Sequence, residues 1–200
     1  MRPTNPQNKT DIIEIAIPLF ARAGHDGVSM RQIAKAVGIK ASSIYHHFPD
    51  KQTLYLAAIK HAFSDKAKIL SESLTTADSP EKRLNDLIAR LCEIMSQSPD
   101  FSSLVQRELL DGDEERLQLL AKQIFNDLFS SITELSKKLA PERDAHLVAI
   151  SLIGLAAYHY QTKSIRQYLS GSKDEHNNPE VVAQHIISLF TQGLVKERNK

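Results

Sequence analysis

A set of side chains between residues 40 and 51 has the sizes and the hydrogen-bond donors that suit contact with a nucleic-acid groove. The centre of the set is small and consists of Ala41, Ser42 and Ser43. The donors and positive charges around it are Lys40, Tyr45, His46 and Lys51. Small residues let a helix approach base edges, and surrounding donors reach phosphate oxygens. The chemistry expected of this set is binding of a polyanion.

Two short helices joined by a tight turn would position these residues. Ser29 and Gln32 have the spacing of a capping box, which predicts a helix that begins at Ser29 and ends at Gly38. A second short helix is expected over about 41–48. Its expected buried positions are Ile44 and Phe48. Such a pair is typical of a helix-turn-helix, whose second helix enters a DNA major groove, although other helical proteins contain similar corners.

The charge distribution favours the same end of the chain. From Met1 to Lys60 there are eight Lys and Arg against four Asp and Glu, a net charge of +4, whereas the remaining 17 basic and 20 acidic residues give −3. A basic first part joined to a slightly acidic second part indicates a polyanionic partner for the first part alone. An ordinary solvated surface is the alternative explanation of the same charges.

Other classes of function leave no trace in the sequence. There is no glycine-rich phosphate loop, no nucleophile elbow and no His-Glu-x-x-His motif, so an enzyme is not expected. The single cysteine, Cys92, provides neither a disulfide framework nor a thiolate cluster for zinc, and we expect no metal and no cofactor. No run of about 18 apolar residues predicts a membrane span, and the polar N-terminus does not read as a signal peptide. We therefore expect a cytoplasmic protein.

The spacing of apolar residues predicts an all-α protein of about nine helices in two domains. The expected helices cover about 10–23, 29–38, 41–48, 50–73, 80–98, 101–110 and 113–139, and two more begin at Pro141 and Pro179. The first domain, residues 1–60, would hold the three-helix helix-turn-helix unit. The second, residues 61–200, would be a helical effector-binding and dimerisation domain.

One predicted helix is apolar on every side. Its residues from Leu147 to Ala157 include a single polar side chain, Ser151, so the whole circumference must be covered. A second subunit that packs on this helix explains the pattern, and burial inside one subunit is the alternative. A homodimer would join helices of about 142–169 and 179–196 from each subunit into a four-helix bundle.

The stretch from Ile12 to Leu56 closely resembles the N-terminal domain of TetR-family transcriptional regulators (TetR/AcrR type). The resemblance rests on Gly-Val-Ser-Met-Arg-Gln-Ile-Ala at 27–34 and on Gly-Ile-Lys-Ala-Ser-Ser-Ile-Tyr-His-His-Phe-Pro-Asp-Lys at 38–51. It implies a ligand-responsive regulator, most simply a repressor, that binds a near-palindromic operator in double-stranded DNA as a homodimer. A small-molecule effector would bind the second domain and release the DNA.

The resemblance also assigns roles to single residues. Ser29 and Lys51 would contact phosphates from helix N-termini, and Tyr45 and His46 would grip the DNA backbone beside the groove. The residues that read bases would be Arg31, Ala41, Ser42 and Ser43. Lys40 replaces the small hydroxyl residue that is common at its position in the family, so the helix after it is expected to lack its usual cap.

The effector pocket implied by the resemblance would be lined by the fourth to eighth helices. The candidate residues are Cys92, Met95, Phe125, Phe129, Tyr158 and His159. Each of them also fits an ordinary core position, and Cys92 fits an inert buried thiol better than a redox sensor.

Several simpler interpretations stay open. Ser29 fits a cap alone, and Tyr45 and His47 fit packing positions. A helical module that binds other proteins is the rival to DNA binding as a whole. A steep fall of affinity with salt would distinguish DNA binding from that rival, because phosphate contacts release counterions.

Overall fold

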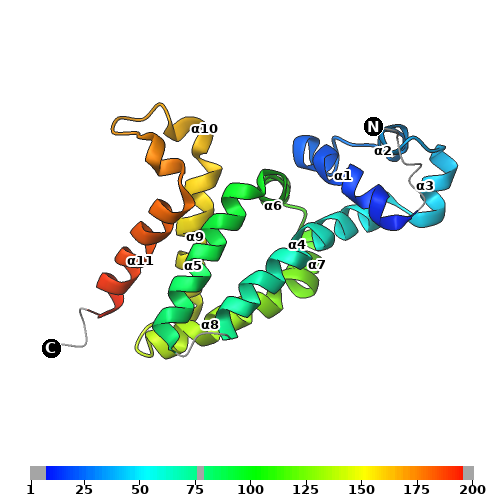
Figure 1. The fold of residues 1–200 in the computed structure, drawn as a ribbon. Coiled ribbons are helices and arrows are strands. Elements are labelled where there is room, and N and C mark those ends of the chain that lie inside the picture. Colours follow the sequence, from blue (N-terminus) through cyan, green and yellow to red (C-terminus); the bar gives the residue numbers. More distant parts are fainter. Residues whose placement is uncertain (1–7, 76–78, 196–200) are drawn as a thin grey trace. The chain divides into compact units, whose positions relative to one another are not determined.

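The computed structural model of the chain describes residues 8–75 and 79–195, and it is helical without strands in these ranges (Figure 1). The first seven helices are α1 (Lys9–Ala23), α2 (Met30–Val37), α3 (Ala41–His47), α4 (Lys51–Thr75), α5 (Pro80–Gln97), α6 (Pro99–Asp111) and α7 (Glu114–Leu120). A π-helical turn (Ala121–Phe125), α8 (Asn126–Leu139), α9 (Ala145–Gln161), α10 (Lys163–Arg166), a 3-10 turn (Asp174–Asn177) and α11 (Pro179–Val195) follow. The all-α prediction is confirmed.

The chain divides into two compact units, and the division is not a single cut. One unit contains residues 1–65 and 100–124, and the other contains 66–99 and 125–200. The first unit therefore holds α1–α3, the beginning of α4, and α6 and α7. The expected boundary at residue 60 leaves out α6 and α7, because sequence spacing gives no sign that they return to the N-terminal helices.

In the first unit, α1 packs on α2 and α2 packs on α3. The apolar stripe of α1 places Ile12 and Phe20 in the core, fully buried beside Ile33 of α2 and Ile44 of α3. Burial of each such side chain contributes about 1.5–3 kcal/mol relative to its exposure. The buried side chains of α2 and α3 thus hold the two helices, and the turn that joins them, against α1.

The ends of α2 are closed as the sequence predicts. The backbone N–H of Gln32 donates to Ser29 Oγ (3.3 Å), and the backbone N–H of Ser29 donates to the Gln32 side-chain oxygen Oε1 (2.8 Å). These two bonds complete the capping box. At the other end Gly38 adopts φ = +81°, a left-handed conformation that glycine tolerates without a Cβ clash. Lys40 caps α3 without a side-chain hydrogen bond, as expected.

Two contacts hold α6 to the N-terminal helices within the first unit. Arg107 Nε donates to the carbonyl of Ala21 (2.7 Å), a carbonyl in the last turn of α1. Phe101 stacks on Phe63 of α4, with 5.9 Å between ring centroids. These contacts explain why residues 100–124 belong to this unit.

A buried ion pair joins α6 to α7. Arg116 Nε donates to Glu108 Oε1 (2.9 Å), and the two side chains are 8% and 1% exposed. The guanidinium also lies 3.3 Å from Asp113 Oδ2 and 6.0 Å from the centre of the Tyr55 ring. Buried charges of this kind are tolerated only when they are paired, so each partner depends on the other.

The second unit is built around α5, which packs on α8, α9 and α11 (Figure 1). The fully buried residues at its centre are Leu87, Ile88, Cys92 and Ala149. The predicted helix starts at Ser79 and Pro179 are confirmed: Ser79 Oγ accepts from the Lys82 amide, and Asn178 Oδ1 accepts from the Glu180 amide.

Two expected elements differ in the structure. The helix predicted over 113–139 is interrupted by the π-helical turn at 121–125, which inserts a wider turn into the three-and-four spacing of its leucines. The helix predicted to open at Pro141 begins at Ala145 instead. The Asp144 carboxylate accepts from the Leu147 amide (3.0 Å), and this cap determines the start.

The buried ion pair gives a test of the first unit. We expect Glu108→Leu to lower the free energy of unfolding by about 3–5 kcal/mol, because it removes the buried carboxylate partner of Arg116 and leaves the guanidinium only the more exposed Asp113. The double variant Glu108→Leu/Arg116→Met should lose less than Glu108→Leu alone, since both charges are removed. Urea unfolding measures this difference.

The exposed pair Glu134 and Lys137 is the matched control, since its side chains are 63% and 58% exposed. Glu134→Leu should leave the free energy of unfolding nearly unchanged, because exposed ion pairs contribute little to stability. A double variant at the buried pair that is as unstable as Glu108→Leu would contradict the interpretation.

Candidate nucleic-acid interface

The residues predicted to contact DNA lie on the solvent side of α2 and α3. Most of them are exposed, namely Ser29, Arg31, Lys40, Ser42, Tyr45 and His46. Ala41 and Ser43 are half-buried. The first unit thus presents one surface that combines small residues, hydroxyls and positive charge, and we call these eight residues together with Lys51 the α2–α3 surface.

The orientation of α3 follows from its buried side. Ile44 is fully buried and Phe48 is 3% exposed, whereas Tyr45 is 51% exposed. A core position for Tyr45 is therefore excluded in this structure, and its ring and hydroxyl face solvent. His46 is exposed and His47 is half-buried, so the two histidines do not share one environment.

Lys51 stands at the first position of α4. The preceding Asp50 caps the helix by accepting from the Thr53 amide (2.6 Å). The Lys51 side chain is 27% exposed, and its ammonium lies 3.5 Å from Asp26 Oδ1. The positive charge assigned to a phosphate contact thus has a carboxylate neighbour from the turn between α1 and α2.

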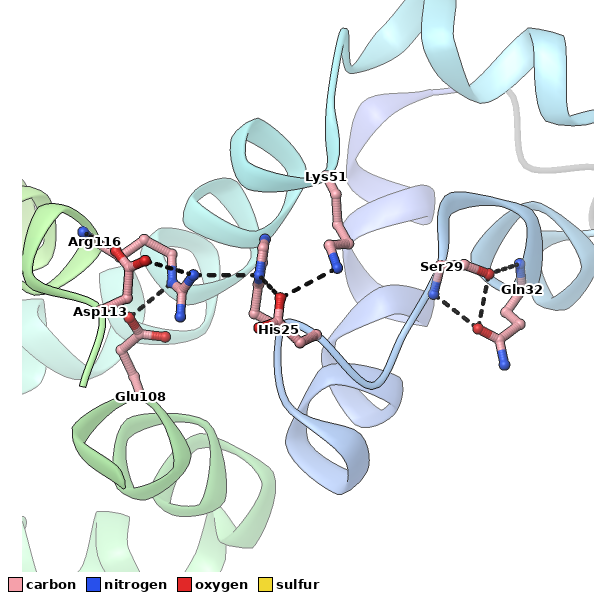
Figure 2. A network of polar contacts seen from close by, with 8 residues as sticks. His25, Ser29, Gln32, Lys51, Glu108, Asp113 and Arg116 are labelled. Carbon is pink, nitrogen blue, oxygen red and sulfur yellow. Dashed lines mark hydrogen bonds and ion pairs between the residues drawn. The ribbon is translucent and has the colours of Figure 1, made fainter. Parts of the chain in front are cut away.

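That carboxylate belongs to a polar network that spacing in the sequence did not indicate. His25 Nδ1 lies 2.8 Å from Asp26 Oδ1 and 3.3 Å from Nη1 of Arg116. Figure 2 shows His25 between Lys51 on one side and the cluster of Arg116, Asp113 and Glu108 on the other. His25 and Arg116 are 91 positions apart in the chain, so no local pattern could have linked them.

Two groups of the network have pKa values that are shifted in opposite directions. The hydrogen bond with His25 holds the pKa of Asp26 below its ordinary value, so this carboxylate is charged at neutral pH. Burial, and then the negative charge of Glu108, raises the pKa of the Tyr55 phenol, which stays protonated. Tyr55 is fully buried, and its ring meets His25 edge to face at 5.1 Å.

The residues predicted to line an effector pocket lie in several places in the second unit. Cys92 is fully buried, Met95 is 8% exposed, and Phe125 and Phe129 are half-buried. Burial raises the pKa of the Cys92 thiol to about 11, as expected for an inert core cysteine. Phe129 packs on the same core as Cys92.

Tyr158 and His159 face a different region. Tyr158 is 69% exposed, whereas His159 is half-buried, with Nε2 2.8 Å from the His176 carbonyl. Both line a groove of about 640 Å³ between α9 and α11. Tyr160, which was not among the predicted pocket residues, is the tyrosine beside Cys92.

A larger groove of about 1080 Å³ lies among α4, α5 and the start of α11. Its walls carry acidic side chains, including Glu72, Asp86 and Glu180, and none of the predicted effector residues. Among residues 8–75 and 79–195, no cluster of His, Cys, Asp or Glu has the composition of a metal site. Within the same ranges, no helix combines the length and the apolar character needed to cross a membrane.

Comparison with known proteins identifies the N-terminal region. Residues 12–58 match the model of the bacterial regulatory proteins of the tetR family. The HTH-type transcriptional regulator YuxN of Bacillus subtilis is 29% identical over 113 residues, which are 56% of this chain and 39% of YuxN. IcaR of Staphylococcus aureus, named as the negative transcriptional regulator of the biofilm operon icaADBC, is 44% identical over 55 residues.

The IcaR match covers 28% of this chain and 30% of IcaR, so the chain spans well under half the length of these relatives. Solved structures match over more of the chain. AibR in complex with isovaleryl coenzyme A and operator DNA has a TM-score of 0.71 at 18% identity, with 90% of this chain and 96% of AibR covered. FadR of Bacillus subtilis in complex with stearoyl-CoA has a TM-score of 0.74 at 16% identity, with coverage of 90% and 98%.

These structural likenesses support the helical fold, and the N-terminal match shows which family this domain resembles. The matched residues include α2, the turn and α3, which carry nearly all of the α2–α3 surface. Residues 12–58 of this chain thus match the domain of the tetR family of bacterial regulatory proteins.

Proposed function

We propose that this protein is a ligand-responsive repressor that binds a palindromic operator as a homodimer and is released by a small-molecule effector. The observation that carries the proposal is the α2–α3 surface, which exposes Tyr45, His46 and Arg31 on a short helix pair held from behind by Ile44. A helix pair that only packed in a core would bury these side chains. The match to the tetR-family domain supports the same reading.

In the proposed complex α3 lies in the major groove. Ala41, Ser42 and Ser43 allow close approach to base edges, and Arg31 reaches a guanine. Tyr45 and His46 contact the DNA backbone beside the groove, and Lys51 contacts a phosphate from the start of α4. The backbone contacts determine register, and the base contacts determine sequence.

Support for the homodimer comes from α9. Its inner residues Ala149, Leu152 and Ala156 are buried, whereas Leu147 and Tyr158 on the outer side are 64% and 69% exposed. Ile150 and Leu155 extend the exposed stripe on α9, and Val181 and Leu189 of α11 are also exposed. A contiguous apolar face of this kind marks an interaction surface, and a second copy would cover it by twofold symmetry.

Repression and an apolar effector are proposed from the names of similar proteins and from the apolar core of the second unit. IcaR is named as a negative regulator, and AibR and FadR are described with acyl-coenzyme A ligands. In this chain the predicted pocket residues Cys92 and Phe129 belong to an apolar core. An acyl chain would suit that environment, so acyl-coenzyme A thioesters are the proposed effector class.

The DNA surface is tested by substitution. Tyr45→Ala and Lys51→Ala should each weaken binding to a duplex enriched from random sequences by about tenfold or more, because a backbone contact is lost. Lys51→Ala should also reduce the slope of log affinity against log salt by about one. Fluorescence anisotropy at several salt concentrations measures both effects.

Tyr168→Ala and Lys122→Ala are matched controls, since both residues are exposed and lie outside the α2–α3 surface. They should leave affinity and salt slope unchanged. Equal losses for controls and surface variants, or affinity that does not depend on salt, would favour the protein-interaction module.

The dimer is tested on α9. Leu147→Asp and Tyr158→Asp place a charge on the exposed apolar face and should convert a dimer into a monomer, with loss of operator binding. Leu110→Asp is the control, because Leu110 is 77% exposed on α6 and not on this face. Analytical ultracentrifugation gives the mass. A wild-type monomer, or a Leu147→Asp protein that stays dimeric, would contradict the assignment.

The effector class is tested by adding acyl-coenzyme A thioesters of different chain lengths to the protein–operator complex. A thioester that prefers the DNA-free state should lower operator affinity by about fivefold or more at saturation. Free coenzyme A is the control for its nucleotide part. If no chain length changes operator affinity, this class is excluded and the effector has another chemistry.

A further inference from the structure

The Nδ1 atom of His25 lies within hydrogen-bond distance of two groups and cannot bond to both of them at once. Its Nδ1 lies 2.8 Å from the Asp26 carboxylate and 3.3 Å from the Arg116 guanidinium. A carboxylate only accepts hydrogen bonds and a guanidinium only donates them, whereas Nδ1 carries either a proton or a lone pair. His25 can therefore hydrogen-bond to one of these neighbours at a time.

The surroundings restrict the alternatives further. The His25 side chain is 12% exposed, and its Nε2 is buried without a hydrogen-bond partner in the described part of the chain. Tyr55 packs against the ring, and Gly24 beside it follows α1 with φ = +72°. The ring thus has little freedom to turn away. The protonation of Nδ1 therefore determines whether His25 bonds to Asp26 or to Arg116.

Asp26 is shared in a similar way. The same oxygen, Oδ1, lies 2.8 Å from His25 and 3.5 Å from the Lys51 ammonium. Asp26 is 84% exposed, so little besides these two neighbours holds it. When His25 donates to Asp26, less of the carboxylate charge remains for Lys51. When His25 accepts from Arg116, the carboxylate is left to Lys51 alone.

We propose that His25 is a positioning residue for the DNA contact of Lys51, because it draws the Asp26 carboxylate away from the lysine ammonium. Arg116 competes for the same nitrogen and so connects the Glu108–Arg116 pair to the α2–α3 surface. The inference rests on the proposed function, in which Lys51 contacts a phosphate. It adds three residues outside the contact itself, namely His25, Asp26 and Arg116, the last of them on α7.

Variants of the full-length protein test the proposal by rescue. His25→Phe keeps a ring against Tyr55 but removes the hydrogen bond to Asp26, so Asp26 pairs with Lys51 and operator affinity should fall about two- to fivefold. Asp26→Ala in the same protein removes the competing carboxylate and should restore the operator affinity. In a Lys51→Ala background neither substitution should matter.

Glu14→Ala is the control for removal of an exposed acid from the same unit, since the Glu14 side chain is 62% exposed. It should not rescue His25→Phe. A His25→Phe protein whose operator affinity stays low after Asp26→Ala would overturn the proposal, because removal of the carboxylate does not repair a merely structural defect. Rescue that persists without Lys51 would overturn it as well.

Nitrogen-15 NMR of the histidine rings gives a readout that does not depend on DNA. At pH 8, where an ordinary histidine is neutral, His25 should carry its proton on Nδ1 in the wild type and on Nε2 in Asp26→Ala. The same tautomer in both proteins would contradict the proposal. Absence of sequence-specific DNA binding by the wild type would instead refute the proposed function, whereas specific binding without rescue refutes this inference alone.

Discussion

The α2–α3 surface depends on the burial of one side of a helix that is too short to be stable alone. Seven residues form fewer than two full turns, and isolated helices of this length are not populated in water. Ile44 and Phe48 are buried in the first unit, and this burial maintains α3. Every proposed base contact from Ala41 to Ser43 therefore depends on packing that occurs on the opposite side of the helix.

The same unit recruits a part of the chain that lies far along the sequence. Arg107 bonds the last turn of α1, and the Glu108–Arg116 pair lies against Tyr55 of α4. Charged groups that are buried in this way favour a single arrangement, because displacement of Glu108 or Arg116 leaves the other without its buried partner. The segment 100–124 thus forms part of the support for α1 and α4 in the first unit, and a change in that segment would act on these helices through the same contacts.

Much of the local structure was predictable from sequence because its causes are local. The capping box of Ser29, the left-handed Gly38 and the absent side-chain cap at Lys40 each depend on a few neighbouring residues. The π-helical turn at 121–125 was missed because regular apolar spacing continues through it. The start of α9 was misplaced because Asp144, and not Pro141, provides the cap.

The parts that could not be predicted arise from contacts between distant segments. No periodicity links His25 to Arg116 or Asp26 to Lys51, although these pairs meet at one end of the α2–α3 surface. The candidate effector residues show the same difficulty. Tyr158 and Tyr160 are two positions apart, yet Tyr158 faces solvent while Tyr160 lies beside Cys92. Helical spacing alone does not say which side of an all-apolar helix faces the core.

Operator binding by a twofold dimer is tested by a selection of bound sequences from random duplex DNA with the purified full-length protein. A twofold dimer that places two α3 helices in successive major grooves should enrich one inverted repeat, with half-site centres about 34 Å apart or somewhat more. That single repeat is the result expected of the proposed repressor. A folded dimer that enriches no sequence, or a repeat without twofold symmetry, would contradict it.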